Sequence, residues 1–135
     1  MNRFFTFDSN TLLSALFDET SVPASALKKA RLNDVLLLSE PVKAEYRRIF
    51  LKSKFDKYIS VAIRIEFIEN IIIHAFPVNI TEEISECRDP KDDMWLSLAI
   101  SAKADCIVTG DKDLLVLHPF RNIPILSPAD FLNHF

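Results

Sequence analysis

The sequence predicts an α/β protein in which helices wrap a parallel β-sheet. Short, continuous apolar runs are typical of strands covered on both faces, and three segments have this character: FFTF at 4–7, VLLLS at 35–39 and CIVT at 106–109. Segments with helical apolar periodicity separate these runs, as in chains that alternate strands with crossover helices. A length of 135 residues fits one domain, and we expect a single domain over residues 1–135.

Weaker signals supply the remaining elements. HAFPV at 74–78 and NIPIL at 122–126 are further strand candidates, and their prolines indicate sheet edges or strand ends. Helical patterns fill the segments 23–33, 40–53, 57–73 and 91–103. Ser39 precedes the second of these helices and has the side chain of an N-cap. The third helix should bury a stripe of apolar side chains at helical intervals, namely Val61, Ile65, Ile68 and Ile72.

Composition narrows the classes of protein to which the chain can belong. Half of the residues are hydrophobic (49%), and the net charge of −3 with a pI near 5.6 is not the basic balance typical of nucleic-acid-binding proteins. The single glycine, Gly110, excludes a glycine-rich phosphate loop. Cys87 and Cys106 have no metal-type spacing and predict reduced thiols in a cytoplasmic protein. The sequence has no signal-peptide pattern and no apolar run long enough to cross a membrane.

Aspartates gather where the predicted strands end. Asp8 directly follows the strand at 4–7, and Asp111 follows the strand at 106–109 after the turn residue Gly110. In a parallel α/β sheet, functional side chains collect outside the carboxyl ends of the strands. If these two strands are neighbours, their backbones lie roughly 5 Å apart. The two carboxylates could then share one metal ion.

The residues DPKDD introduce the last predicted helix and supply three more acids. Asp89 has the position of an N-cap, with acids following in the first turn. Asp92 lies three residues before Trp95 and seven before Ala99, so it shares the buried side of the helix. Asp93 lies about 100° further round the helix and is expected to be more exposed to solvent. An acid on a buried side needs a partner, and a metal ion or its water would serve.

Glu45 is the fourth candidate acid, on the helix SEPVKAEYRRIF. It lies on the flank of an apolar stripe, three residues after Val42 and four before Ile49. Two interpretations remain open from position alone: Glu45 contributes to an acidic site, or it forms an exposed i,i+3 pair with Arg48.

Four acids on four separate elements favour a hard divalent cation. Mg²⁺ and Mn²⁺ prefer carboxylate and water oxygens over nitrogen or sulfur. Such a site can lower the pKa of a bound water and stabilise the charge that develops on a phosphodiester. The three histidines have no ligand spacing and no partner for general-base catalysis, which a metal-free ribonuclease would need.

These motifs resemble the PIN-domain family. The likeness rests on FDSN at 7–10, SEPVKAEYRRI at 39–49, RDPKDDMWLSLAISAKADCIVTGDKDLL at 88–115 and ILSPADFL at 125–132, and it covers nearly the whole chain. Its most specific part is the joint pattern DPKDD, LA, AD, IVTGDKDLL. Within the family the chain is similar to the VapC-type toxins of type II toxin–antitoxin systems.

The resemblance implies a fold and an activity. The fold is a three-layer α/β/α sandwich, PIN-like and Rossmann-like, with a central parallel sheet of about five strands. The activity is that of a Mg²⁺- or Mn²⁺-dependent endoribonuclease that hydrolyses RNA with a metal-activated water. Family toxins form homodimers and are inhibited by a cognate antitoxin, so we expect both partners here.

The resemblance also assigns roles to individual residues. The catalytic and metal-holding acids are Asp8, Glu45, Asp92 and Asp111, and Asp113 assists in holding the metal. Asn10 and Thr109 match small polar positions that orient the acids, and Asp93 is a supporting residue. Basic side chains would bind the substrate phosphates. The candidates are Lys28, Lys29, Arg31, Arg47, Arg48, Lys52 and Lys54. Each of these is more often part of a solvated helix face.

Two other classes of function stay open. In a phosphatase-like or receiver-like α/β protein, Asp8 would be phosphorylated, and a lysine at a late strand end would assist, a position that only Lys112 approaches. In a binding module that has lost catalysis, the acids would attract a basic partner peptide. An acyl-phosphate on Asp8 would favour the former, and an absence of metal affinity would favour the latter.

Overall fold

The protein, described by a computed structural model for residues 2–135, is built on a five-stranded sheet with the order β3-β2-β1-β4-β5. Every neighbouring pair of strands is parallel. The strands are β1 Phe4–Phe7, β2 Val35–Leu38, β3 Phe76–Pro77, β4 Cys106–Val108 and β5 Ile125–Leu126. The three apolar runs predicted as strands form the centre of the sheet. The two weaker, proline-marked candidates form its edges, where a missing N–H donor is tolerated.

Strands β1 and β4 are direct neighbours, which is the condition for their terminal acids to lie close together. Phe5 lies opposite Cys106 and Phe7 opposite Val108. The pairing continues one residue further, because the N–H of Asp8 donates to the carbonyl oxygen of Val108 at 3.2 Å. Asp8 and the residue that follows Val108 therefore come together at the carboxyl edge of the sheet.

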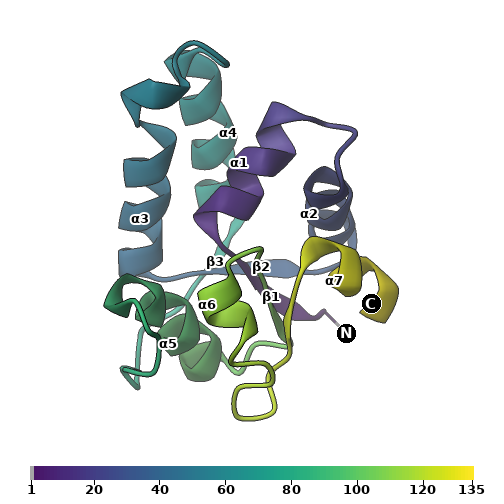
Figure 1. Ribbon diagram of the computed structural model, residues 1–135, viewed down its shortest axis with the longest axis vertical. Helices are drawn as coiled ribbons and strands as arrows, with labels where there is room; N and C mark the ends of the chain where they lie inside the picture. The colour runs from purple at the N-terminus through teal and green to yellow at the C-terminus, as the bar shows by residue number, and fades with distance from the viewer. Residues whose placement is uncertain (1) are drawn as a thin grey trace.

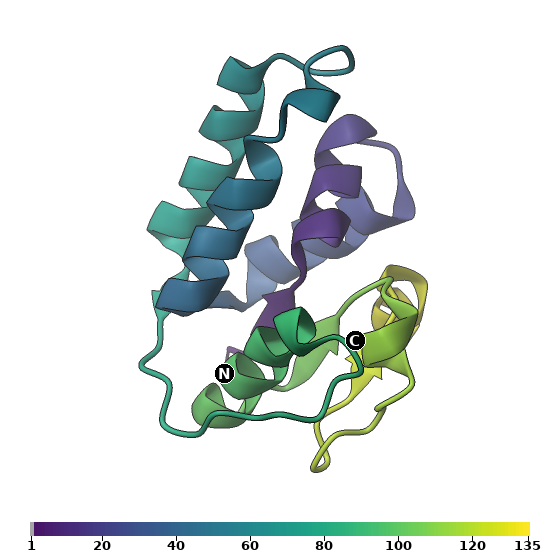
Figure 2. The same ribbon diagram turned by 60° about the vertical axis from the view of Figure 1, so that its left-hand side comes forward.

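Helices lie on both sides of the sheet, which gives the predicted α/β/α sandwich (Figure 1). Helix α5 packs on β1, β2 and β4 from one side, whereas α2 and α7 lie on the other. Helices α3 and α4 pair with each other and rise away from the sheet (Figure 2). The bounds are α1 Ser9–Phe17, α2 Val22–Asn33, α3 Glu40–Phe50, α4 Val61–His74, α5 Asp93–Ala102, α6 Lys112–Leu115 and α7 Pro128–His134, with 3₁₀ turns at Ser53–Phe55 and Pro90–Asp92.

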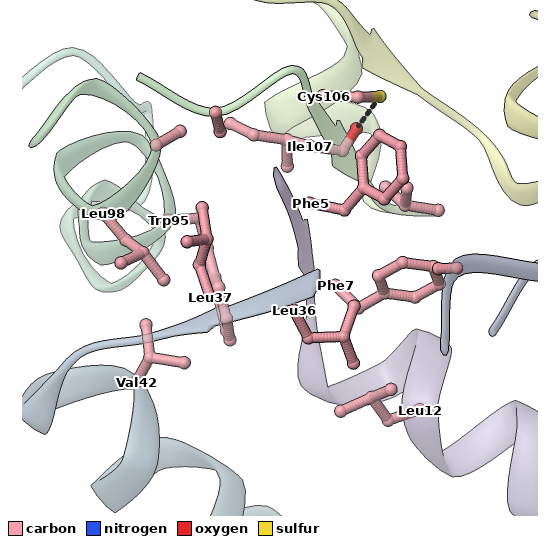
Figure 3. Close-up of a cluster of buried hydrophobic side chains, with 14 of the residues drawn as sticks. Phe5, Phe7, Leu12, Leu36, Leu37, Val42, Trp95, Leu98, Cys106 and Ile107 are labelled. Atoms are coloured by element: carbon pink, nitrogen blue, oxygen red, sulfur yellow. Dashed lines mark hydrogen bonds between the residues drawn. The ribbon is translucent and has the colours of Figure 1, made fainter. Parts of the chain in front are cut away.

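The core is continuous through the sheet (Figure 3). On one side, Phe5 of β1 packs edge-on against Phe131 of α7, with ring centroids 4.9 Å apart. On the other side, Trp95 of α5 lies against Tyr46 of α3, with centroids 5.7 Å apart. Burial of both faces explains why the central strands carry uninterrupted apolar runs instead of alternating ones. Among residues 2–135, no helix has both the length and the apolarity needed to span a membrane.

Helix α4 corrects one prediction from the sequence. Of the expected buried stripe, Ile68 is buried, but Val61 and Ile65 are 42% and 41% exposed. The buried side instead carries Ile71 and the charged residue Arg64. Ile72 is partly buried against the core, so the prediction holds for Ile68 and Ile72 and is wrong for Val61 and Ile65. Apolar residues occupy several sides of this helix, so periodicity alone does not fix the buried side.

Three helices were not predicted. Helix α1 begins directly after Asp8, and its apolar residues lie around much of its circumference because it is enclosed between other helices. Helices α6 and α7 are short, with few turns over which a periodic pattern could develop. The observed helices α2, α3, α4 and α5 agree with the predicted segments to within a few residues.

Candidate metal centre

Asp8 is held at the end of β1 by the start of helix α1. It is the N-cap of that helix, and its Oδ1 accepts the N–H of Thr11 at 2.9 Å. Its Oδ2 accepts the hydroxyl of Thr109. Burial raises the pKa of Asp8 above its ordinary value, although the hydrogen bonds from Thr109 and Thr11 lower it in part. Each oxygen keeps a second lone pair, so these hydrogen bonds orient the carboxylate and leave it able to contact a further group.

Thr109 connects the two strand-end acids. Its hydroxyl donates to Asp8, and the same oxygen accepts the main-chain N–H of Asp111 at 3.0 Å. Asp111 is in turn the N-cap of α6, with its Oδ1 accepting the N–H of Asp113 at 2.9 Å. The hydrogen bonds therefore run in one chain from β1 across β4 into α6, and they fix the direction of both carboxylates.

Asp92 joins these acids from the start of α5. Asp92, Asp111 and Asp113 each offer a carboxylate oxygen, and these oxygens all lie within 4.8 Å of one another. Burial raises the pKa of Asp92 to about 7, with a further contribution from a hydrogen bond and repulsion from Asp111. Asp92 and Asp111 therefore compete for negative charge, and a bound cation would relieve that competition.

Asp8 and Asp111 open onto a shared surface pocket of about 720 Å³. Asn10 and Asp113 also line it, together with the basic side chains of Arg88 and Lys112. Thr109 lies behind this wall, fully buried. Asp111 and Asp113 belong both to this pocket and to the three-acid group, so they lie between Asp8 and Asp92. Asn10 lines the pocket, and Thr109 is hydrogen-bonded to Asp8. All the acidic donors are oxygens, a set that suits Mg²⁺ or Mn²⁺.

Glu45 has a different environment. The guanidinium of Arg48 donates hydrogen bonds to both carboxylate oxygens of Glu45, at 2.8 and 2.9 Å. This is the i,i+3 pair that the sequence left open as one interpretation. Within residues 2–135, Glu45 belongs neither to the three-acid group nor to the lining of the acidic pocket. The next residue of α3, Tyr46, does reach the site, since its hydroxyl donates to the carbonyl oxygen of Phe7 at 2.6 Å. Glu45 thus directly precedes in sequence a residue that contacts the site, but its own carboxylate is bound by Arg48.

Asp93 points away from the acids. Its Oδ1 accepts the main-chain N–H groups of Glu86 and Cys87 at 3.1 and 2.8 Å. It lines a second pocket, of about 440 Å³, together with Ser39 and Met94. The sequence suggested that Asp93 would be more exposed, but it is partly buried and holds the preceding loop in place.

Arg88 is the site residue that sequence reasoning missed. Its guanidinium contacts both oxygens of Asp113 at 3.1 and 2.9 Å, and this contact lowers the pKa of Asp113. The basic residues named for phosphate contacts lie elsewhere: Arg47 pairs with Glu69 and Arg31 with Asn70. Only the position of Arg88, directly before the DPKDD helix start, could have pointed to it.

Comparison with known proteins supplies the class. The sequence model of the PIN domain matches residues 5–113, which is most of the chain. The protein therefore belongs to the PIN-domain family. A similar solved structure is the crystal structure of VapBC2 from Rickettsia felis bound to a DNA fragment from its promoter. That match has a TM-score of 0.57 and 16% identity, and it covers 92% of this chain and 97% of the other. A search of curated proteins gave no match.

Proposed function

We propose that the protein is a Mg²⁺- or Mn²⁺-dependent endoribonuclease. The observation that carries this function is a set of acids from separate elements. Asp92, Asp111 and Asp113 bring carboxylate oxygens within 4.8 Å of one another. Asp111 and Asp113 also line the pocket onto which Asp8 opens. Membership of the PIN family supports nuclease chemistry at this edge of the sheet. We assign catalytic roles to Asp8, Glu45, Asp92 and Asp111, with Asp113 as a further metal ligand.

Neighbouring residues of the chain orient the acids for that chemistry. Thr11 and Thr109 hold the carboxylate of Asp8, and Thr109 also holds the backbone of Asp111. Asp92 and Asp111 share a hydrogen bond, and a divalent cation held by the two residues would take the place of the shared proton. A bound divalent ion would lower the pKa of its water and stabilise the charge on the attacked phosphodiester. Glu45 would have to leave Arg48 to take part directly.

The biological setting that we propose is a toxin–antitoxin pair in the cytoplasm. The structural similarity to VapBC2, a toxin–antitoxin complex by its name, supports an antitoxin partner for this chain. The resemblance of the motifs to VapC-type toxins supports a homodimer. Copurification with the product of an adjacent small gene would test the partner, and light scattering of the purified chain would test the dimer.

Cleavage of a mixed RNA pool with and without Mn²⁺ tests the activity. The parent protein should cut RNA only with the metal, and Asp8→Asn and Asp111→Asn should each lower the rate at least about 100-fold, a loss typical of catalytic groups. Asp18→Asn is the matched control, because Asp18 is exposed at the opposite end of α1 from Asp8. Both site variants cutting RNA at the parental rate would contradict the assignment.

A further inference from the structure

Arg88 combines an exposed side chain with a fixed backbone. The side chain is 82% exposed, and its guanidinium contacts Asp113 at the wall of the acidic pocket. An ion pair this exposed contributes little to stability, because water and salt screen the attraction between its charges. Stability of the fold therefore does not account for the placement of a guanidinium against the metal-binding acids.

The backbone on the N-terminal side of Arg88 is bound to helix α5. Asp93, Ser97 and Ser101 follow one another at intervals of four residues, so they share one side of that helix. Each accepts main-chain N–H groups of the loop, and together they take those of Thr81, Glu82, Ile84, Glu86 and Cys87. The side chain of Ile84 is buried beneath the same loop.

The backbone on the C-terminal side is fixed as well. Asp89 caps the 3₁₀ turn by accepting the N–H of Lys91 at 3.0 Å, and its carbonyl oxygen accepts the N–H of Asp92 at 2.9 Å. Arg88 thus stands between two anchored segments. Its Cα has a set position at the pocket, while the exposed guanidinium can change partner.

The negative charge of the pocket suggests a role for the Arg88 guanidinium beside it. Asp8, Asp111 and Asp113 line the pocket, and a polyanionic substrate approaching three carboxylates would be repelled. A divalent ion offsets only part of that charge. A guanidinium presents a planar pair of N–H donors that matches two oxygens of a phosphate as well as it matches a carboxylate.

We propose that Arg88 binds a phosphate of the RNA substrate beside the metal centre. In the free protein its guanidinium is held by Asp113; in the complex it exchanges Asp113 for the non-bridging oxygens of a backbone phosphate. Asp113 is thereby freed toward the metal. The proposal deepens the nuclease function proposed above and rests on it.

Binding of a labelled single-stranded RNA pool, measured with Ca²⁺ at several salt concentrations, tests the role. Arg88→Gln should weaken binding about tenfold and reduce the slope of log K against log salt by about 0.7. Arg88→Lys should restore only part of the affinity. The lysine keeps the positive charge, but it lacks the paired N–H donors of the planar guanidinium. Arg121→Gln is the matched control: Arg121 is also exposed and pairs with a carboxylate, Glu82, at 2.6 Å away from the pocket.

Calorimetric titration with Mn²⁺ in the absence of RNA separates phosphate binding from support of Asp113. Arg88→Gln should bind Mn²⁺ at least as tightly as the parent, since Asp113 loses a competing cation. Parental RNA affinity and salt slope in Arg88→Gln would overturn the role of Arg88 alone. A parallel loss of Mn²⁺ affinity would overturn it in favour of a purely supporting contact. Failure of the parent itself to bind RNA would overturn the proposed nuclease function and the role of Arg88 with it.

Discussion

At the scale of single residues, Thr109 has a central place in the site. One hydroxyl serves as donor to Asp8 and as acceptor for the N–H of Asp111, and the residue is fully buried. Thr6, on the neighbouring strand, is equally buried, but its hydroxyl has no hydrogen-bond partner in the protein. The two threonines therefore make a natural pair for comparison.

Thr109→Val should lower the free energy of unfolding by about 1–3 kcal/mol, because it leaves an oxygen of Asp8 and the N–H of Asp111 without a partner. It should also lower the rate of RNA cleavage, since two of the proposed metal ligands, Asp8 and Asp111, lose their orientation. Thr6→Val removes only an unpaired hydroxyl and should leave the stability unchanged or raise it. Urea denaturation of both variants measures the difference, and equal effects at the two positions would contradict the bridging role.

At the scale of elements, the link between α3 and α4 depends on a buried charge. Arg64 is 0% exposed, and its guanidinium donates to the carbonyl oxygens of Phe50, Lys52 and Ile59. It also pairs with Asp56, whose side chain is more than half exposed. These contacts satisfy carbonyl groups where α3 ends, so Arg64 closes the helical pair that rises from the sheet.

Arg64→Met keeps most of the side-chain volume but should destabilise the protein by about 3 kcal/mol, since several buried carbonyl oxygens lose their donors. Arg47→Met provides the comparison. Arg47 also makes a two-point contact, with Glu69 at 2.8 Å, but its side chain is about half exposed. Its loss should lower the urea midpoint much less than the loss of Arg64, because solvent screens this pair. Similar urea midpoints for the two variants would show that the buried guanidinium does not hold the α3–α4 link.

At the scale of the whole molecule, the acids come together only when the sheet is assembled, so the proposed metal binding would be coupled to folding. The pKa of Asp92 is about 7 in the folded protein, against an ordinary value of 3.8. Folding therefore favours the protonated form. The contribution of Asp92 to stability is fully present below pH 3.8 and is lost as the pH rises through about 7.

Mn²⁺ binds the deprotonated acids, so its effect should have the opposite pH dependence. The rise in melting temperature caused by Mn²⁺ should be larger at about pH 8 than at about pH 6, and binding at about pH 6 should release more protons. Thermal scans and calorimetry in buffers of different ionisation enthalpy measure these quantities. Asp92→Asn should abolish most of the pH dependence, and an unchanged dependence in that variant would contradict the role of Asp92.

The sequence by itself determined the order of the five strands along the chain, the four longest helices between them and the positions of the candidate acids. Apolar runs at β1, β2 and β4 are visible because burial on both faces leaves no polar alternation. Asp8 and Asp111 are visible because they follow those runs directly, and parallel strands end at one edge. Asp92 is visible because its helix has a clear buried side, which Trp95 and Ala99 define.

Only the tertiary structure decided which charges face each other. Arg64 is buried in α4 where Val61 and Ile65 were expected, because the end of α3 supplies carbonyl acceptors there. Glu45 is held by Arg48, and Asp113 by Arg88 from 25 residues earlier in the chain. Such pairings depend on distances between side chains of different elements. A pattern along one chain fixes the side of an element on which a residue lies, but it does not fix the partner that packing brings to it.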